Sequence, residues 1–246
     1  MANANGKVAI VTGGSRGIGA AIAERLGIDG FAVVINYAGS AAEAETLAGK
    51  ISQAGGRAIT AQADVSSASG VASMFNTVES AFGGVDVLVN NAGVMRLAAI
   101  SEADDSLFDS QIAINLKGTF NTLREATRRL RNGGRIVNLS SSQTSLLHPT
   151  YGIYAATKAA VEVMTQVLSK ELRGRNITVN AVAPGPTATK LFLNGKSKDV
   201  IDRLANLAPL ERLGEPADVA AVVAFLAGTD GGWINGQVLR ANGGII

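Results

Sequence analysis

Short β-branched runs recur along the whole chain with helix-like segments between them, and this alternation limits the possible folds more than any other feature. The runs are Val8–Val11, Ala32–Ile35, Arg57–Ala61, Val85–Val89, Arg135–Leu139, Thr178–Ala183 and Gln237–Arg240. Most are continuously apolar instead of alternating, which is typical of strands that are covered on both faces of a sheet. The pattern therefore predicts seven buried strands.

The segments between the runs have amphipathic patterns. They are Gly19–Asp29, Ala41–Ala54, Ser67–Phe82, Ile112–Leu130, Tyr151–Arg173 and Pro216–Ala227. Gly-Gly pairs at 55–56, 83–84 and 133–134 are expected where a helix stops before the next strand. Regular strand–helix–strand order predicts a doubly wound α/β fold, with a seven-stranded parallel sheet, right-handed crossovers and helices on both faces. No linker, repeat or low-complexity tract divides residues 1–246, so we expect a single domain.

One region, from Thr187 to Glu215, breaks this regularity. It holds polar residues and isolated apolar ones, and it connects two strand–helix units. Long connections in compact domains are often lids or binding loops. The alternative is a pair of short surface helices without contact to a ligand, and the sequence leaves both possibilities open.

Composition excludes several functional classes. The chain has 47% hydrophobic and 17% charged residues, which excludes disorder of the chain as a whole. It has no cysteine, which excludes disulfides, thiolate catalysis, iron–sulfur clusters and cysteine-based zinc sites. A single histidine, His148, excludes multi-histidine metal sites, and a net charge of +2 gives no indication of nucleic-acid binding. Residues 1–6 have no signal-peptide pattern, and no run approaches the ~18 apolar residues of a membrane span. We therefore expect a cytoplasmic protein without a metal, nucleic-acid or membrane partner.

A glycine-rich turn follows the first strand and precedes the first helix. Its sequence is Thr12-Gly13-Gly14-Ser15-Arg16-Gly17-Ile18-Gly19. Glycines allow a sharp turn and a close approach of ligand to backbone, while the free N–H groups of a helix start attract a pyrophosphate. The spacing differs from the common G-x-G-x-x-G fingerprint, yet the position in a strand–helix unit predicts a dinucleotide site in a Rossmann-type fold.

The T-G-x-x-x-G-x-G pattern resembles that of the short-chain dehydrogenase/reductase family, and further motifs extend the resemblance over essentially the whole chain. Asn90-Asn91-Ala92-Gly93 is similar to the family's N-N-A-G motif, and Tyr154 with Lys158 forms Y-x-x-x-K, 13 residues after Ser141. Asn115 and the Pro184-Gly185…Thr189 pattern also match. Within the family, the sequence most resembles 3-oxoacyl-[acyl-carrier-protein] reductases and small carbonyl reductases.

The resemblance implies a nicotinamide coenzyme, and the end of the second strand favours NADP(H) over NAD(H). Asn36 stands where NAD enzymes carry an acidic residue, and the first carboxylate beyond it is Glu43. Arg16 is a candidate cation for binding the 2′-phosphate. The alternative is that Arg16 is a solvated loop residue without contact to the coenzyme. The complete set of expected coenzyme residues is Gly13, Ser15, Arg16, Gly17, Ile18, Gly19, Asn36, Tyr37, Ala38, Ser40, Ala63, Asp64, Val65, Asn91, Ala92, Gly93, Tyr154, Lys158, Pro184, Gly185, Thr187 and Thr189.

The expected catalytic residues are Asn115, Ser141, Tyr154 and Lys158. A tyrosine pKa near ~10 must fall by about three units to reach neutrality, which requires ~4 kcal/mol. A lysine ammonium ~4 Å away at an effective dielectric of ~20 supplies about that much. We therefore expect Tyr154 to exchange the proton and Lys158 to lower its pKa. The resemblance implies that Ser141 polarises the carbonyl and that Asn115 holds a helix distortion and a water.

Other residues have plainer interpretations. His148 is expected at the rim of the substrate pocket, and Met95, Met164 and Trp233 are expected to pack inside the protein. The segment from Leu191 to Leu210 would cover a modest apolar pocket, because it carries several leucines and no cluster of cations.

These features predict an NADP-dependent oxidoreductase that moves a hydride between nicotinamide and a small ketone, aldehyde or secondary alcohol. The alternatives are a 3-oxoacyl-[acyl-carrier-protein] reductase and, from a different class, a catalytically silent dinucleotide sensor. The resemblance also implies a homotetramer joined through the segments 112–130 and 151–173 and the C-terminal strand.

Overall fold

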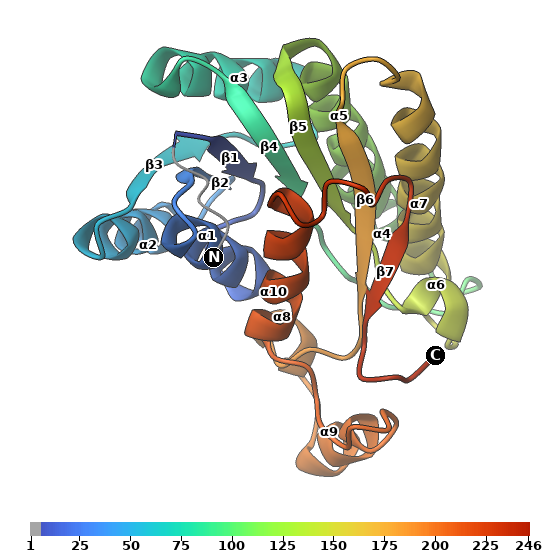
Figure 1. The fold of residues 1–246 in the computed structure, drawn as a ribbon. Helices are drawn as coiled ribbons and strands as arrows, with labels where there is room; N and C mark the ends of the chain where they lie inside the picture. The colour runs from blue at the N-terminus through green and yellow to red at the C-terminus, as the bar shows by residue number, and fades with distance from the viewer. Residues whose placement is uncertain (1–5) are drawn as a thin grey trace.

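A computed structural model describes residues 6–246 and contains one seven-stranded, fully parallel sheet (Figure 1). The strands are β1 (Val8–Val11), β2 (Ala32–Tyr37), β3 (Arg57–Gln62), β4 (Val85–Asn90), β5 (Leu130–Leu139), β6 (Thr178–Pro184) and β7 (Val238–Ala241). Their order is β3-β2-β1-β4-β5-β6-β7, and every pair of neighbours runs parallel. The predicted doubly wound Rossmann-type architecture is confirmed.

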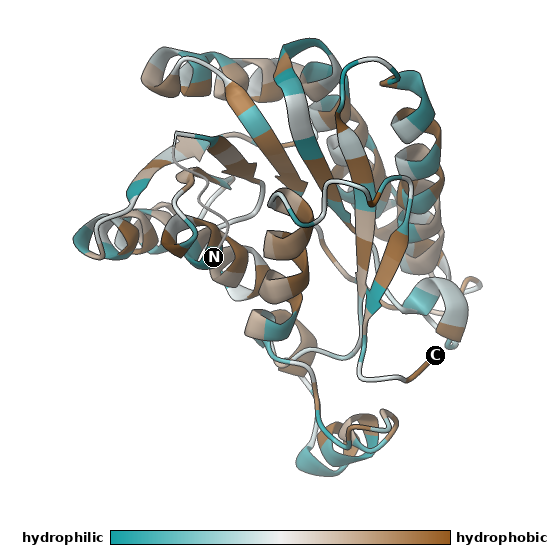
Figure 2. Cartoon of the chain, in the orientation of Figure 1, coloured by the Kyte–Doolittle hydropathy of each residue, from teal (hydrophilic) through white to brown (hydrophobic). Residues whose placement is uncertain are grey.

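Helices cover both faces of the sheet, so the apolar strands are buried on both sides (Figure 2). One core includes residues of α1 (Gly17–Ile28), α2 (Ala41–Gln53) and α10 (Pro216–Ala227). The opposite core includes residues of α3 (Ala68–Phe82), α5 (Gly118–Arg129) and α7 (Gly152–Glu171). Alternate residues of a strand serve the two cores: Val11 faces the first and Ile10 the second.

The strand order reverses direction at β1, which pairs with β2 on one side and with β4 on the other. In open α/β sheets, ligands bind outside the carboxyl ends of the strands at such a switch point. The glycine-rich turn follows β1 and the Asn91-Ala92-Gly93 segment follows β4. The topology thus brings these two motifs to the same edge of the sheet.

The predicted helix 112–130 is wrong in its boundaries. A helical run starts earlier, with α4 (Asp105–Gln111), continues as a π-helix, η1 (Ile112–Lys117), and ends as α5 at Arg129. The Asp104 side chain accepts a hydrogen bond from the Leu107 N–H and thereby caps α4. Strand β5 begins at Leu130, so Gly133 and Gly134 lie inside this strand and not at a helix end.

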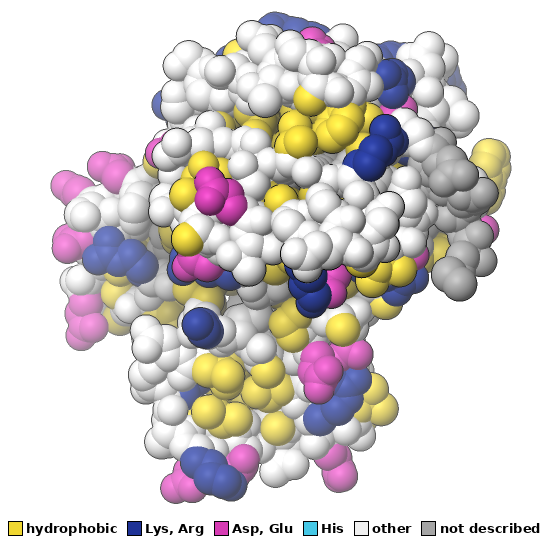
Figure 3. All heavy atoms as spheres, turned by 90° about the vertical axis from the view of Figure 1, so that its left-hand side faces the viewer, with side chains coloured by type: hydrophobic (Ala, Val, Ile, Leu, Met, Phe, Trp, Pro, Cys, Tyr) yellow, Lys and Arg dark blue, Asp and Glu magenta, His cyan; other side chains and the backbone are white. Residues whose placement is uncertain are grey.

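The irregular region contains two short helices, α8 (Lys190–Leu193) and α9 (Lys198–Ala205), neither of which has a fully buried residue. In Figure 1, α9 projects beyond the end of the sheet, and Figure 3 shows hydrophobic side chains exposed on this projecting part. Exposed apolar side chains of the region include Leu191, Leu207 and Leu210. An apolar surface at this place is consistent with the expected substrate cover.

Trp233 contradicts the sequence-based expectation. Its side chain is 98% exposed, in the loop between α10 and β7, whereas Met164 does pack against the core as expected.

Among residues 6–246, no helix combines the length and apolar character that crossing a membrane requires. The same residues hold no cluster of three or more potential metal ligands of the His, Asp or Glu type. Residues 1–5, where no signal-peptide pattern was found, lie outside the described residues.

Candidate active site

The glycine-rich turn adopts the conformation that its sequence predicts. Gly13 and Gly17 have φ angles of +59° and +56°, a region that favours glycine. A Cβ at Gly19 would lie 2.3 Å from the Gly13 carbonyl oxygen and 2.4 Å from the Asn91 amide nitrogen, so no side chain fits there. Helix α1 begins at Gly17 without a side-chain cap, and its first N–H groups therefore suit an anionic ligand.

The residues after β4 hold this turn in place. The Thr12 hydroxyl accepts hydrogen bonds from the N–H groups of Asn91 and Ala92, at 3.0 and 3.1 Å. The Asn91 side chain in turn donates to the carbonyls of Thr12 and Gly13, both at 3.0 Å. The N-N-A-G motif therefore shapes the glycine-rich turn through the side chain of Asn91. Thr12 is the structural partner of this motif, and no role for it was expected from the sequence.

Asn36 is positioned differently from the expectation. Its side chain is 1% exposed, donates to the carbonyls of Ala61 and Ala63, and accepts from the Gly13 N–H. It thus ties the glycine turn to β3 and is not free to contact a 2′-phosphate. A short uncharged amide satisfies three backbone groups here, whereas an acidic side chain could donate to neither carbonyl unless it were protonated.

The other residues expected around the adenosine lie around the ends of β2 and β3. Ala38 is exposed, Tyr37 and Ser40 are half-buried, and Glu43 lies in the first turn of α2. Arg16 is exposed at the N-terminus of α1. Ala63 and Val65 belong to the core, so only their backbone is available, whereas Asp64 is exposed and accepts a hydrogen bond from the Ser66 N–H.

The segment after β6 meets the glycine turn. A Cβ at Gly17 would lie 3.6 Å from the Thr189 methyl group, so the two segments face one another. The Thr187 hydroxyl is buried and donates to the Gly185 carbonyl, and Thr189 caps α8 by accepting from the Phe192 N–H. Both threonine side chains therefore support the loop next to Pro184, and Thr189 faces the glycine-rich turn at Gly17.

Ser141 and Tyr154 are brought together at the carboxyl end of β5. Ser141 directly follows Ser140 at the end of that strand, and Tyr154 lies in the first turn of α7. The Ser141 hydroxyl is near enough to the Tyr154 phenol to lower its pKa. Next to them, His148 hydrogen-bonds the Gln143 side chain and packs edge-on against Tyr151, in keeping with a place at the rim.

Lys158 lies one helical turn after Tyr154 and is 6% exposed. Its ammonium donates to the Leu139 carbonyl at 2.8 Å and lies 5.8 Å from the centre of the Tyr154 ring. Burial lowers the pKa of Lys158 to about 8, because the charged form loses its hydration. A buried lysine beside a hydroxyl pair is a marked functional-site feature.

Tyr154 does not have the low pKa that we expected from Lys158. Burial raises its pKa to about 12, with the nearby Ser141 hydroxyl acting in the opposite direction and Tyr151 raising it further. The expectation of a near-neutral phenol is therefore wrong for the protein chain by itself. The physical reason is that desolvation of the buried phenolate dominates, while Lys158 directs its ammonium at the Leu139 carbonyl.

Asn115 lies in the π-helical segment, fully buried. Its side chain accepts from the Val94 N–H at 2.8 Å and donates to the Val94 carbonyl at 2.9 Å. It thereby bonds the helix to the segment after Gly93, and the expected helix distortion is confirmed. A Cβ at Gly93 would lie 3.3 Å from the Asn115 oxygen and 3.6 Å from the Lys158 ammonium, so both groups face the space beside Gly93.

The fold and these motifs define a class: a Rossmann-type dinucleotide-binding protein with a serine–tyrosine–lysine set at the carboxyl end of its parallel sheet. The family described as enoyl-(acyl carrier protein) reductase has a sequence model that matches residues 13–246. A chloroplastic NADPH-dependent aldehyde reductase-like protein of Arabidopsis thaliana is 48% identical, covering 98% of this chain and 94% of its own length.

Solved structures give the same picture. A short-chain dehydrogenase from Burkholderia cenocepacia in complex with NADP is 40% identical, with a TM-score of 0.93 over 99% of both chains. The angucycline C-6 ketoreductase LanV with bound NADP is 40% identical, with a TM-score of 0.94 over 99% of this chain and 97% of its own. The chain belongs to the short-chain dehydrogenase/reductase family and is an oxidoreductase of that family.

Proposed function

We propose that this protein is an NADP-dependent oxidoreductase that transfers a hydride between nicotinamide and a small ketone, aldehyde or secondary alcohol. The observation that carries the proposal is that Ser141 and Tyr154 lie together beside buried Lys158, at the same end of the sheet as the glycine-rich turn. The relatives support it, since two of them are named as NADPH-dependent aldehyde reductases and one as a ketoreductase.

Each residue has a distinct role in carbonyl reduction. Tyr154 donates the proton to the developing alkoxide, and Ser141 holds and polarises the carbonyl oxygen. Lys158 stabilises the phenolate that forms and holds the coenzyme ribose, and Asn115 supports the segment that faces it. NADPH would supply the hydride when bound, and its oxidised form would carry positive charge on the nicotinamide.

The pKa values suit the reductive direction. Because burial raises the pKa of Tyr154 to about 12, the phenol stays protonated through the neutral range and is ready to donate. The reverse reaction needs a phenolate, and that form requires positive charge from Lys158 and the oxidised ring together. A complete serine–tyrosine–lysine set also has no purpose in a silent dinucleotide sensor.

Selection of NADP rests on charge at the end of β2. Neither Asn36 nor the exposed residues up to Ser40 present a carboxylate that would repel a 2′-phosphate, and exposed Arg16 can pair with one. We propose contacts from Arg16, Tyr37, Ala38 and Ser40, with Asn36 shaping the turn. Replacing Arg16 with alanine should raise KM for NADPH about tenfold or more, while KM for NADH stays nearly constant.

The proposed function is tested with a panel of small ketones and aldehydes, each assayed with NADPH and with NADH. We expect consumption of NADPH with several carbonyls and a clearly lower kcat/KM with NADH. Acetoacetyl carrier protein is included, since preference for it over free carbonyls would instead indicate the carrier-protein reductase. No turnover with any carbonyl, together with retained NADPH binding, would overturn the catalytic proposal.

We further propose a cytoplasmic homotetramer made of one domain per chain. Support comes from exposed apolar side chains on the helices that the resemblance assigns to contacts: Phe120 on α5 and Val163 and Val167 on α7. Exposed Trp233 and Phe225 form a second candidate contact. Large apolar side chains on a surface commonly mark such interfaces. Sedimentation velocity at micromolar concentration measures the assembly.

A further inference from the structure

Glu162 lies on the same helical face as the proposed catalytic pair, but the proposed reaction gives it no role. Tyr154, Lys158 and Glu162 follow one another at intervals of four residues along α7, so they lie one above the other. The Glu162 side chain is half-buried and, among residues 6–246, takes part in no salt bridge. Its carboxylate must therefore find its partners elsewhere.

Those partners flank Ser141 on both sides. The Ser140 hydroxyl donates to Glu162 Oε1 at 2.5 Å, and the Thr144 hydroxyl lies 3.1 Å from the same oxygen. Thr144 has a second acceptor, the Ser141 carbonyl at 3.0 Å, and its single proton serves one of the two at a time. Ser140 is 4% exposed, so without Glu162 a buried hydroxyl would lose its acceptor.

The opposite side of this loop is anchored to β6. The N–H groups of Ser140 and Ser142 donate to the carbonyls of Val182 and Pro184, at 2.7 and 2.9 Å. Ser141 therefore lies between Ser140 and Ser142, whose backbones are bonded to β6. Glu162 restrains the same loop through the side chains of Ser140 and Thr144. Within this loop, the Ser141 hydroxyl accepts a hydrogen bond from the Gln143 N–H at 3.2 Å.

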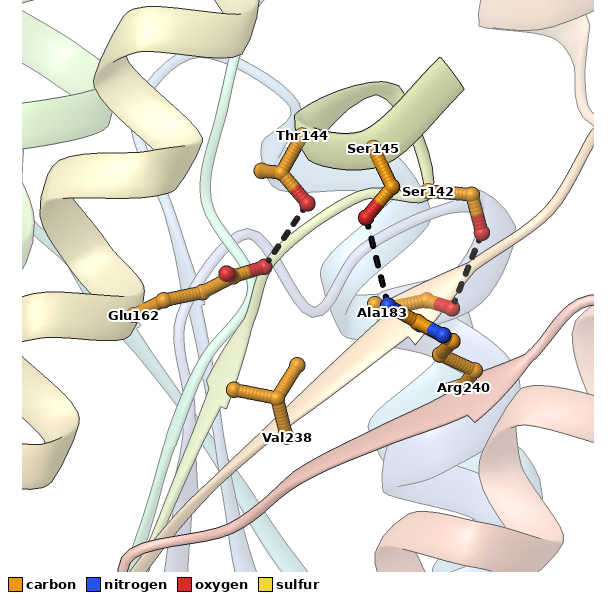
Figure 4. Close-up of a pocket in the computed structure, with 7 residues that line it drawn as sticks. All are labelled: Ser142, Thr144, Ser145, Glu162, Ala183, Val238 and Arg240. Carbon is orange, nitrogen blue, oxygen red and sulfur yellow. Dashed lines mark hydrogen bonds between the residues drawn. The ribbon is translucent and has the colours of Figure 1, made fainter. Parts of the chain in front are cut away.

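A surface pocket of about 410 Å³ adjoins the carboxylate, with Thr144 and Glu162 on one side and Ser145 with Arg240 on the other (Figure 4). The Arg240 guanidinium donates to Ser145 and not to Glu162. The pocket leaves the carboxylate accessible to water, which reduces the cost of keeping a charge beside the loop. A strong acceptor can thus remain here without a cationic partner.

We propose that Glu162 is a positioning residue that restrains the 140–144 loop and so holds Ser141 in the geometry required for hydride transfer. The proposal rests on the proposed function, in which Ser141 polarises the carbonyl. It makes one helix, α7, responsible for all three elements of the chemistry: the proton donor, the ammonium and the restraint on the serine.

The test compares Glu162→Ala and Glu162→Gln with a matched control, Glu171→Ala, at the exposed C-terminal end of the same helix. Glu162→Ala should lower kcat for ketone reduction about 10- to 100-fold, with little change in NADPH affinity. Glu162→Gln keeps an acceptor oxygen and should recover most of the rate, and Glu171→Ala should match the wild type. Equal rates for wild type and Glu162→Ala would overturn the proposal.

A double-mutant cycle shows whether Glu162 acts through Ser141. In a Ser141→Ala background, Glu162→Ala should cause no further loss of rate, whereas an independent additional loss would contradict the proposal. Hydrogen–deuterium exchange gives a readout that needs no activity: peptides covering 140–147 should exchange faster in Glu162→Ala, and unchanged exchange would overturn the restraint. If the wild type reduces no carbonyl, the proposed function fails, and the exchange result still decides on the restraint.

Discussion

At the scale of single residues, the balance between burial and charge at Tyr154 and Lys158 decides the chemistry. Burial moves the two pKa values apart, raising that of the phenol to about 12 and lowering that of the ammonium to about 8. The spacing Y-x-x-x-K predicts that the two groups meet, but spacing carries no information on desolvation. That is why the residues were predictable from the sequence and the direction of the tyrosine shift was not.

Replacing Tyr154 with phenylalanine removes the proton donor and little else. We expect kcat for ketone reduction to fall by about 10²- to 10⁴-fold, because a positioned general acid usually accelerates a reaction by that factor. NADPH binding should be retained. Steady-state kinetics and coenzyme fluorescence titration measure the two quantities. Tyr151→Phe is the matched control, because that ring lies 6.4 Å from Tyr154 but lacks a lysine four residues later. Equal losses in the two variants would contradict the assignment.

Lys158 should make stability depend on pH in a defined window. Its pKa falls from the ordinary 10.5 to about 8 on folding, so the folded state binds this proton more weakly, at a cost of ~3 kcal/mol. The cost is complete below pH 8, where both states are protonated, and it disappears as pH rises toward 10.5.

Lys158→Met removes this contribution. The free energy of unfolding of the variant, relative to the wild type, should therefore decrease by about 3 kcal/mol between pH 7 and pH 10.5, because the wild type gains stability over that range. Urea titrations at several pH values measure the difference. A difference that does not change with pH would show that the ammonium is not destabilised by burial.

At the scale of elements, a chain of buried polar side chains joins two helices on the same face of the sheet by way of β4 and β5. Thr122 on α5 donates to the Asn90 side chain, Asn90 donates to Asn138 on β5, and Asn138 donates to Thr165 on α7. All four residues are buried. The chain links α5 to α7, the helix that carries Tyr154 and Lys158.

Asn138→Ala should break this chain. The Asn90 amide would lose its acceptor inside the protein, so the free energy of unfolding should fall by about 1–3 kcal/mol. Chemical denaturation measures the loss, and Asn206→Ala, at an exposed position after α9, should change stability by less than about 0.5 kcal/mol. Equal stabilities of the two variants would contradict a satisfied network at Asn138.

Elements differ in how well their sequences predict them. The buried strands and the glycine turn were predictable, because apolar runs and glycine spacing are local signals. Helix α4 was missed since Asp105–Gln111 has few apolar residues, although Asp104 is a typical N-cap. In the π-helical segment, the Asn115 side chain accepts a hydrogen bond from the N–H of Val94, 21 residues away, and no local pattern reveals this contact. The role of Asn36 likewise depends on three distant backbone groups.

At the scale of the whole molecule, assembly should depend on the exposed face of α7. Val163→Glu with Val167→Glu places two charges on this exposed apolar surface, so we expect dissociation to smaller species without loss of the fold. Sedimentation velocity and circular dichroism measure the two outcomes. Lys170→Glu, on the same helix, is the charge-matched control. An unchanged sedimentation coefficient in the double variant would place the contacts elsewhere.

Trp233, the one tryptophan of the chain, has a practical consequence because its indole is 98% exposed in a single chain. Its fluorescence emission in an isolated chain should already lie at the long wavelengths of a water-exposed indole, so unfolding such a chain would shift the spectrum very little. Contact with a neighbouring subunit would instead move the emission to shorter wavelengths. If the proposed assembly covers Trp233, its fluorescence would report association while changing very little when an isolated chain unfolds.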